Sequence, residues 1–97
     1  MSNSNEPAIV RILEREYRVM CDPEQRRELM ESALFLDNQM REIRDSGRIS
    51  SIDKIAVMSA LNLAEEVLKL RKQLKEREEQ VDLRVRQMAI DLDRSLS

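Results

Sequence analysis

The chain has 97 residues, of which 41% are apolar and 37% are charged, with one Gly, two Pro, one Phe, one Tyr and no Trp or His. So few aromatic and turn-forming residues favour long helices over a compact globule. A chain of this length also buries too little apolar surface by itself, which predicts self-association. The 17 basic and 19 acidic side chains nearly cancel, so the basic surface that nucleic acid requires is not expected.

Most residue types that serve in catalysis or metal binding are missing. A single Cys21 without any His provides neither an internal disulfide, nor a zinc ligand set, nor an imidazole base. The sequence also has no glycine-rich phosphate loop. We therefore expect no enzyme, no metal and no other cofactor, and no small-molecule substrate. A site built from carboxylates alone is the enzymatic alternative.

No apolar stretch approaches the roughly 20 residues of a membrane span. The first residues, Met-Ser-Asn-Ser-Asn-Glu, have neither the basic nor the apolar region of a signal peptide. Both observations predict a cytoplasmic protein that does not bind membranes.

Two short runs rich in β-branched residues predict a β-hairpin over residues 8–21, preceded by a disordered N-terminus, residues 1–7. The turn is expected at residues 14–16. Because Glu14 and Arg15 are not the residues that tight hairpin turns favour, a longer loop or a bulge is as compatible as a two-residue turn. Alternation predicts one apolar face, formed by Val10, Ile12, Tyr17, Val19 and Cys21. A lone hairpin is marginal in water, so this one must pack on a helix or extend a partner's sheet.

Asp22 and Pro23 form a helix start, with Asp as the N-cap and Pro at the first helical position. The helix is predicted over residues 23–46, and Gly47 ends it in the left-handed conformation. Its apolar positions recur at steps of three and four, which indicates one buried face. They are Leu29, Ala33, Leu36, Met40 and Ile43.

From residue 52 onward the chain contains no Gly or Pro, which predicts a single helix of about 45 residues. Residues 52–64 are apolar around most of the circumference, so this part is expected to complete a globular head, residues 8–64. Met58 and Leu61 lie in this segment, and we expect them to face a dimer partner or the first helix. The resulting fold class is α+β: a small head of hairpin and helix, followed by one very long helix that forms a coiled coil in an oligomer.

Residues 65–97 are predicted to form the coiled-coil tail. Apolar residues recur there at the three and four spacing of a coiled coil, at Val67, Leu70, Leu74, Val81, Val85, Met88 and Leu92. The polar run at residues 75–80 inserts a stutter through Glu78, which locally unwinds a supercoil. Two helices alone would leave part of the renewed stripe in water. A four-helix arrangement would cover it, so Val81, Val85, Met88 and Leu92 are the predicted tetramer interface.

The order of hairpin, Asp-Pro start, Gly-bearing turn and very long helix resembles the ZapA family of bacterial cell-division proteins, regulators of the tubulin-like filament protein FtsZ. Two segments carry the resemblance: YRVMCDPEQR at residues 17–26 and VMSALNL at residues 57–63. It extends from about residue 9 to residue 96. Glu14 departs from the family pattern, because some members have Gly before the turn Arg.

The resemblance implies a dimer of heads with a parallel coiled coil, joined tail to tail into an antiparallel tetramer, with Val85 at a position that matches a tetramer-interface residue. It implies that the heads bind FtsZ filaments and cross-link or bundle them, promoting the cytokinetic Z-ring at mid-cell. It also implies filament contact at four basic positions, Arg15, Arg18, Arg44 and Arg48. From the residues alone, Arg41, Arg44 and Arg48 are equally a solvated face. A generic coiled-coil adaptor or chaperone-like scaffold unrelated to division is the alternative function.

Overall fold

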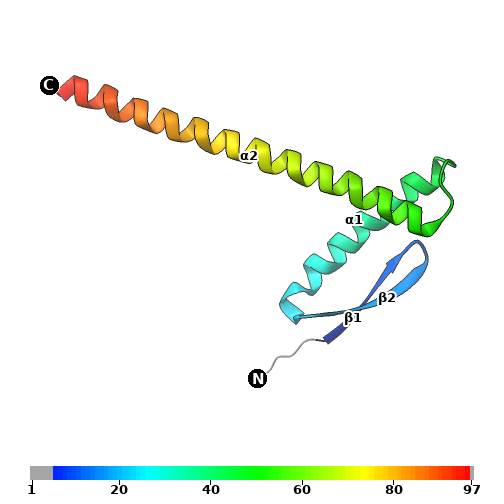
Figure 1. Ribbon diagram of the computed structural model, residues 1–97. Coiled ribbons are helices and arrows are strands. Elements are labelled where there is room, and N and C mark those ends of the chain that lie inside the picture. Colours follow the sequence, from blue (N-terminus) through cyan, green and yellow to red (C-terminus); the bar gives the residue numbers. More distant parts are fainter. Residues whose placement is uncertain (1–5, 97) are drawn as a thin grey trace. The chain divides into compact units, whose positions relative to one another are not determined.

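The computed structural model describes residues 6–96, which form one antiparallel hairpin and two α-helices (Figure 1). The elements are β1 (Glu6–Ile12), β2 (Arg15–Cys21), a 3₁₀ turn (Pro23–Gln25), α1 (Arg26–Asp45) and α2 (Ile52–Leu96). This order of hairpin, helix and long helix confirms the α+β fold class predicted from the sequence. Of the predicted disordered N-terminus, residues 1–5 lie outside the described residues. Glu6 and Pro7 belong to β1, so for these two the prediction is wrong.

Two compact units divide the chain between Leu61 and Asn62. We call the described residues 6–61 the head and residues 62–96 the tail. The first turns of α2 therefore belong to the head and the remainder of α2 to the tail. The boundary predicted from the sequence falls between residues 64 and 65.

The hairpin turn consists of Leu13 and Glu14, which corrects the expected turn at residues 14–16. Both residues have positive φ, 49° and 64°, the pattern of a tight hairpin turn whose twist matches that of the strands. Ile12 pairs with Arg15 on either side of it. Leucine and glutamate are poor residues for this conformation, so contacts outside the turn must stabilise it.

The register of the strands produces the predicted apolar face of the hairpin. Val10 lies opposite Tyr17, and Ala8 lies opposite Val19, so these four side chains share one face. Ala8 and Val10 are buried, whereas Tyr17 stays exposed at 44%. Figure 1 shows the hairpin beside α1. On this face, the residues of β1 are therefore covered by the rest of the head, and Tyr17 of β2 is not.

A small apolar core joins the hairpin turn to both helices. Leu13 from the turn, Met40 from α1 and Ile55 from α2 are each less than a tenth exposed. Five partly buried residues pack around them: Ile12, Leu36, Ile43, Ile49 and Ile52. Because β1, the hairpin turn, α1 and α2 each contribute at least one member, burial of this cluster links the hairpin to both helices.

The ends of α1 follow the sequence signals unequally. Gly47 has φ of 76°, and its N–H donates to the Arg44 carbonyl at 3.0 Å, which confirms the predicted left-handed stop. Pro23 opens the 3₁₀ turn, as its fixed φ favours. The Asp22 side chain, in contrast, makes no capping hydrogen bond. Only its carbonyl accepts from the Gln25 N–H, at 2.9 Å.

Ser59 of α2 is completely buried, one turn after Ile55. Its Oγ has no hydrogen-bond partner among the described residues. A buried hydroxyl without a partner loses its hydration and gains nothing in exchange. The position therefore requires a small side chain and not the hydroxyl itself.

We predict that Ser59→Ala raises the free energy of unfolding, by about 1 kcal/mol, because it removes the unpaired hydroxyl and improves helix propensity. Urea denaturation at fixed protein concentration measures the change. Ser32→Ala, at an exposed position of α1, is the matched control, since it improves propensity alone. A Ser59→Ala protein less stable than wild type would show that the hydroxyl has a stabilising partner.

Candidate functional site

The hairpin turn is attached to α1 through the carboxylate of Asp37. The Leu13 N–H donates to Asp37 Oδ1 at 2.8 Å, and Arg41 Nε donates to Asp37 Oδ2 at the same distance. The Asp37 side chain is only 13% exposed. The hydrogen bonds from Arg41 and from the Leu13 N–H lower the pKa of Asp37 below its ordinary value of 3.8, against the opposing effect of burial. The hydrogen bond to Asp37 in turn raises the pKa of Arg41.

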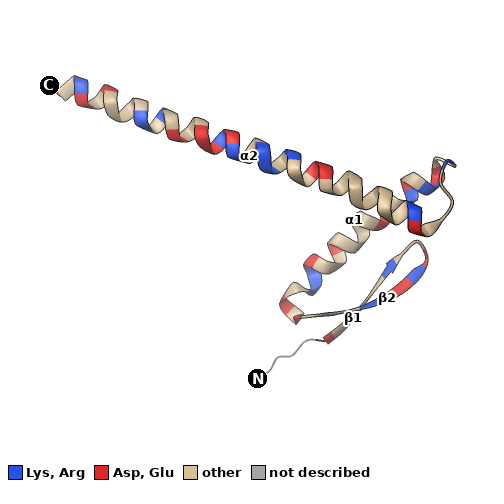
Figure 2. Ribbon diagram, in the orientation of Figure 1, with Lys and Arg blue, Asp and Glu red and all other residues tan. Residues whose placement is uncertain are grey.

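Glu14 extends this network to a second arginine. Its Oε2 lies 3.1 Å from Arg41 Nη2, and its Oε1 lies 3.2 Å from Arg44 Nη1. Arg44 also approaches Asp45, at 3.5 Å between Nε and Oδ1. We call Glu14, Asp37, Arg41 and Arg44 the tip cluster. Figure 2 shows charges of both signs at this end of the head, so the cluster is a balanced network and not a free basic patch.

The four predicted filament-binding arginines are only partly brought together. Arg44 belongs to the tip cluster, and Arg15 directly follows the turn residue Glu14 that Arg44 contacts. Arg18 lies opposite Ile9, whereas Arg15 lies opposite Ile12, so the two arginines of β2 are on opposite faces of the hairpin. Arg48 is exposed in the connection after α1. Arg15, Arg18 and Arg48 form no ion pair with any described residue.

Asp37 and Glu14 are the site residues that the sequence reasoning missed. Asp37 and Arg41 are four residues apart in a helix, with the acid first, which is the favoured order for a pair on one helical face. That spacing was a usable signal. The contact with Leu13 crosses 24 positions, and no local pattern encodes it.

The residues predicted for the head dimer interface lie on the surface of the single chain. Met58 is 39% and Leu61 59% exposed. Met58 also lines a shallow apolar groove at the start of α2, together with Ile49, Asp53, Lys54 and Val57. An exposed apolar surface of this kind is available to a partner chain.

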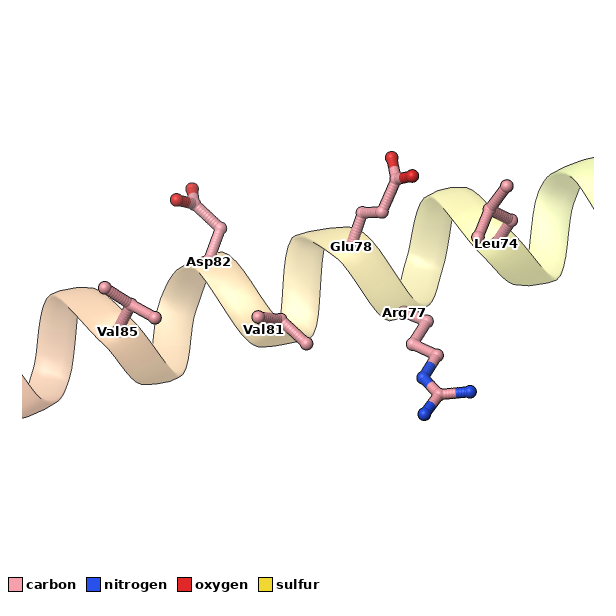
Figure 3. A pocket seen from close by; sticks show the side chains of 6 residues that line it. All are labelled: Leu74, Arg77, Glu78, Val81, Asp82 and Val85. Carbon is pink, nitrogen blue, oxygen red and sulfur yellow. The ribbon is translucent and has the colours of Figure 1, made fainter.

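The tail carries the predicted coiled-coil residues on one side of α2, all at least 46% exposed. We call them the tail stripe: Val67, Leu70, Leu74, Val81, Val85, Met88 and Leu92. Around the stutter, Leu74, Val81 and Val85 line a shallow groove (Figure 3). Glu78 and Asp82 project from one side of it and Arg77 from the other. The apolar stripe is thus flanked by opposite charges, as coiled-coil seams commonly are.

Within residues 6–96, no helix is both apolar enough and long enough to cross a membrane. Among residues 6–96, no group of three or more His, Cys, Asp or Glu side chains is placed to hold a metal ion.

A charged α+β head and a helix with a long exposed apolar stripe define a class of protein built around surfaces for other protein chains. The family model of cell division protein ZapA matches residues 9–95. The cell division protein ZapA of Pseudomonas aeruginosa PAO1 is 38% identical over 97 residues, which is all of this chain and 92% of that protein. The chain therefore belongs to the ZapA family of cell-division proteins.

Two solved structures are similar to the chain. The first is described as an unknown conserved bacterial protein from Pseudomonas aeruginosa PAO1, with 37% identity and a TM-score of 0.71 over 94% of this chain and 99% of that one. The second is a ZapA mutant dimer from Geobacillus stearothermophilus, with 25% identity and a TM-score of 0.64 over 84% and 93% of the two chains.

We predict that Asp37→Asn destabilises the head by about 1 kcal/mol at neutral pH, because the amide retains the Leu13 hydrogen bond but loses the ion pair with Arg41. A lowered folded-state pKa contributes stability that is present above 3.8 and is lost as the pH falls below it. The difference between wild type and Asp37→Asn should therefore shrink below pH 3.8 in urea denaturation.

Glu31→Gln is the matched control for this prediction. It removes a pair of the same spacing, between Arg27 and Glu31, whose side chains are 91% and 72% exposed. Exposed pairs contribute little, so Glu31→Gln should stay close to wild type at all pH values. An Asp37→Asn protein as stable as Glu31→Gln at neutral pH would contradict the role given to Asp37.

Proposed function

We propose that this protein binds FtsZ filaments through its heads and cross-links or bundles them, which promotes assembly and stability of the cytokinetic Z-ring. The observation that carries the proposal is the family match over residues 9–95, almost the whole chain. The protein would act in the cytoplasm at mid-cell. It would act as a structural partner of the filament and not as an enzyme, without a metal, a nucleotide or any other cofactor of its own.

Self-association supplies the geometry that cross-linking requires. The exposure of Met58 and Leu61 supports a head dimer through the start of α2, and a ZapA mutant from Geobacillus stearothermophilus is described as a dimer. A parallel coiled coil would then bury the first part of the tail stripe. Two such dimers would join through an antiparallel four-helix contact at Val81, Val85, Met88 and Leu92, which presents heads at both ends.

The charges of the head suggest how it recognises a filament. Arg15, Arg18, Arg44 and Arg48 are the proposed contact residues, and an acidic filament surface would attract them during encounter. Each contact can be weak. Once one head is bound, the remaining heads act at a raised local concentration along a lattice of identical sites.

A generic coiled-coil adaptor or chaperone-like scaffold would share the long helix and the apolar stripe. The match of the head together with the tail to one family of cell-division proteins favours the division function. Binding to polymerised FtsZ is the measurement that separates the two functions.

We predict that the wild-type protein sediments with GTP-polymerised FtsZ and increases light scattering by bundling the filaments. Binding should weaken as salt rises from about 50 to about 300 mM, because exposed charges are screened. FtsZ with GDP, which does not present filaments, is the control. Absence of both sedimentation and bundling at low salt would refute the division function and leave the adaptor alternative.

We predict that Val85→Glu splits the tetramer into dimers, because it places charges inside the proposed four-helix contact. Filament binding per head should persist while bundling falls. Mass in solution, measured by light scattering across a concentration series, reports the assembly.

Leu83→Glu is the matched control for Val85→Glu. Leu83 is similarly exposed, at 62% against 58% for Val85. Because two residues turn an α-helix by about 200°, Leu83 lies on the opposite side of α2 from the tail stripe. It should remain tetrameric. Full bundling by a Val85→Glu protein shown to be dimeric would disprove the requirement for a two-ended particle.

A further inference from the structure

Arg41 and Arg44 point guanidinium groups at one carboxylate, that of Glu14. The contacts are 3.1 Å to Arg41 Nη2 and 3.2 Å and 3.5 Å to Arg44 Nη1. The arginine side chains are 39% and 37% exposed, and the Glu14 side chain is 57% exposed. The Glu14 side chain is thus the most exposed of the three.

The arginines have other contacts that do not depend on Glu14. Arg41 Nε is bonded to Asp37 Oδ2 at 2.8 Å, and Asp37 is itself held by the Leu13 N–H. Arg44 Nε lies 3.5 Å from Asp45 Oδ1. When the Glu14 side chain rotates away, the Nη groups of both arginines therefore remain placed to bind a carboxylate. Two guanidinium groups on one carboxylate form charge-assisted hydrogen bonds, which are stronger than neutral ones.

We propose that Arg41 and Arg44 form a carboxylate-binding site that Glu14 occupies in the free protein, and that a carboxylate of an acidic partner surface replaces Glu14 when the head docks. Glu14 is then an internal competitor for the partner. The inference rests on the proposed function in that the partner is taken to be the FtsZ filament.

The exchange is small in energy because one carboxylate replaces another. An exposed ion pair contributes little to stability, so releasing Glu14 costs the head little. The backbone need not move, because Leu13 stays bonded to Asp37 and buried in the core. Arg41, which was absent from the sequence-based contact residues, becomes a binding residue beside Arg44.

The test compares Glu14→Gln with Glu16→Gln by sedimentation with polymerised FtsZ at about 50 mM and about 300 mM salt. Both variants remove one negative charge near the turn, but Glu16 forms no ion pair with any described residue. Glu14→Gln should lower the half-saturating concentration about threefold relative to Glu16→Gln at low salt, the size expected of one exposed ion pair. The difference should fall below about 1.5-fold at high salt.

A double variant ties the gain to the site. In the Arg44→Gln background the gain should disappear, so that Arg44→Gln with Glu14→Gln binds no tighter than Arg44→Gln alone, because the second guanidinium of the site is lost. The proposal is overturned if Glu14→Gln binds no tighter than Glu16→Gln, which would make Glu14 a bystander. It is equally overturned if Glu14→Gln binds more weakly, which would make Glu14 a support for the arginines. Far-ultraviolet circular dichroism verifies that each variant is folded.

Poly-L-glutamate is a second probe, and it separates this inference from the proposed function. Tighter binding of poly-L-glutamate by Glu14→Gln than by Glu16→Gln supports the carboxylate site even if the wild-type protein fails to sediment with FtsZ. In that case only the filament function is refuted. Sedimentation of the wild-type protein, together with equal behaviour of the two variants towards both probes, refutes only the carboxylate site.

Discussion

The hydrogen bond from the Leu13 N–H to Asp37 stabilises the hairpin turn, whose conformation the local sequence disfavours. Leu13 and Glu14 reverse the chain with positive φ angles, although neither is a residue that turns of this type select. The side chain of Leu13 compensates by entering the core with Met40 and Ile55. One residue thus connects the hairpin to α1 through its backbone and to α2 through its side chain. The placement of Arg15, Glu14 and the tip cluster follows from that connection.

The spacing of the apolar residues and the positions of Gly and Pro predict the helices from the sequence. Gly47 has no side chain, and nothing lies within 4 Å of where a Cβ would stand, so its presence reflects backbone conformation alone, which a sequence pattern can reveal. The sequence predicts a turn that begins one residue too late, because the conformation at Leu13 and Glu14 is imposed by tertiary contacts with Asp37 and the core. Such contacts override local preference. Tertiary packing likewise overrides the polarity of Ser59, which is completely buried.

The candidate site illustrates a further limit of reasoning from charge alone. The sequence shows four basic positions, Arg15, Arg18, Arg44 and Arg48, but it does not show which acidic side chains pair with them in the folded head. Glu14 is 30 positions away from Arg44 in the sequence, and strand alternation separates Arg15 from Arg18. In the folded head, Arg44 is paired with Glu14, Arg15 and Arg18 lie on opposite faces of the hairpin, and Arg48 is exposed in the connection after α1.

The helix α2 is shared by two units with different sources of stability. Its beginning is buried with Ile55 and Ser59, whereas residues 64–96 are all exposed in the single chain. Pairs along the tail such as Asp82 with Arg86 add only a few tenths of a kcal/mol, and long helices in water owe most of their stability to packing. Helicity of the tail is therefore coupled to protein concentration by mass action, while the head retains a core of its own. The abundance of the protein therefore sets how much of the tail is helical.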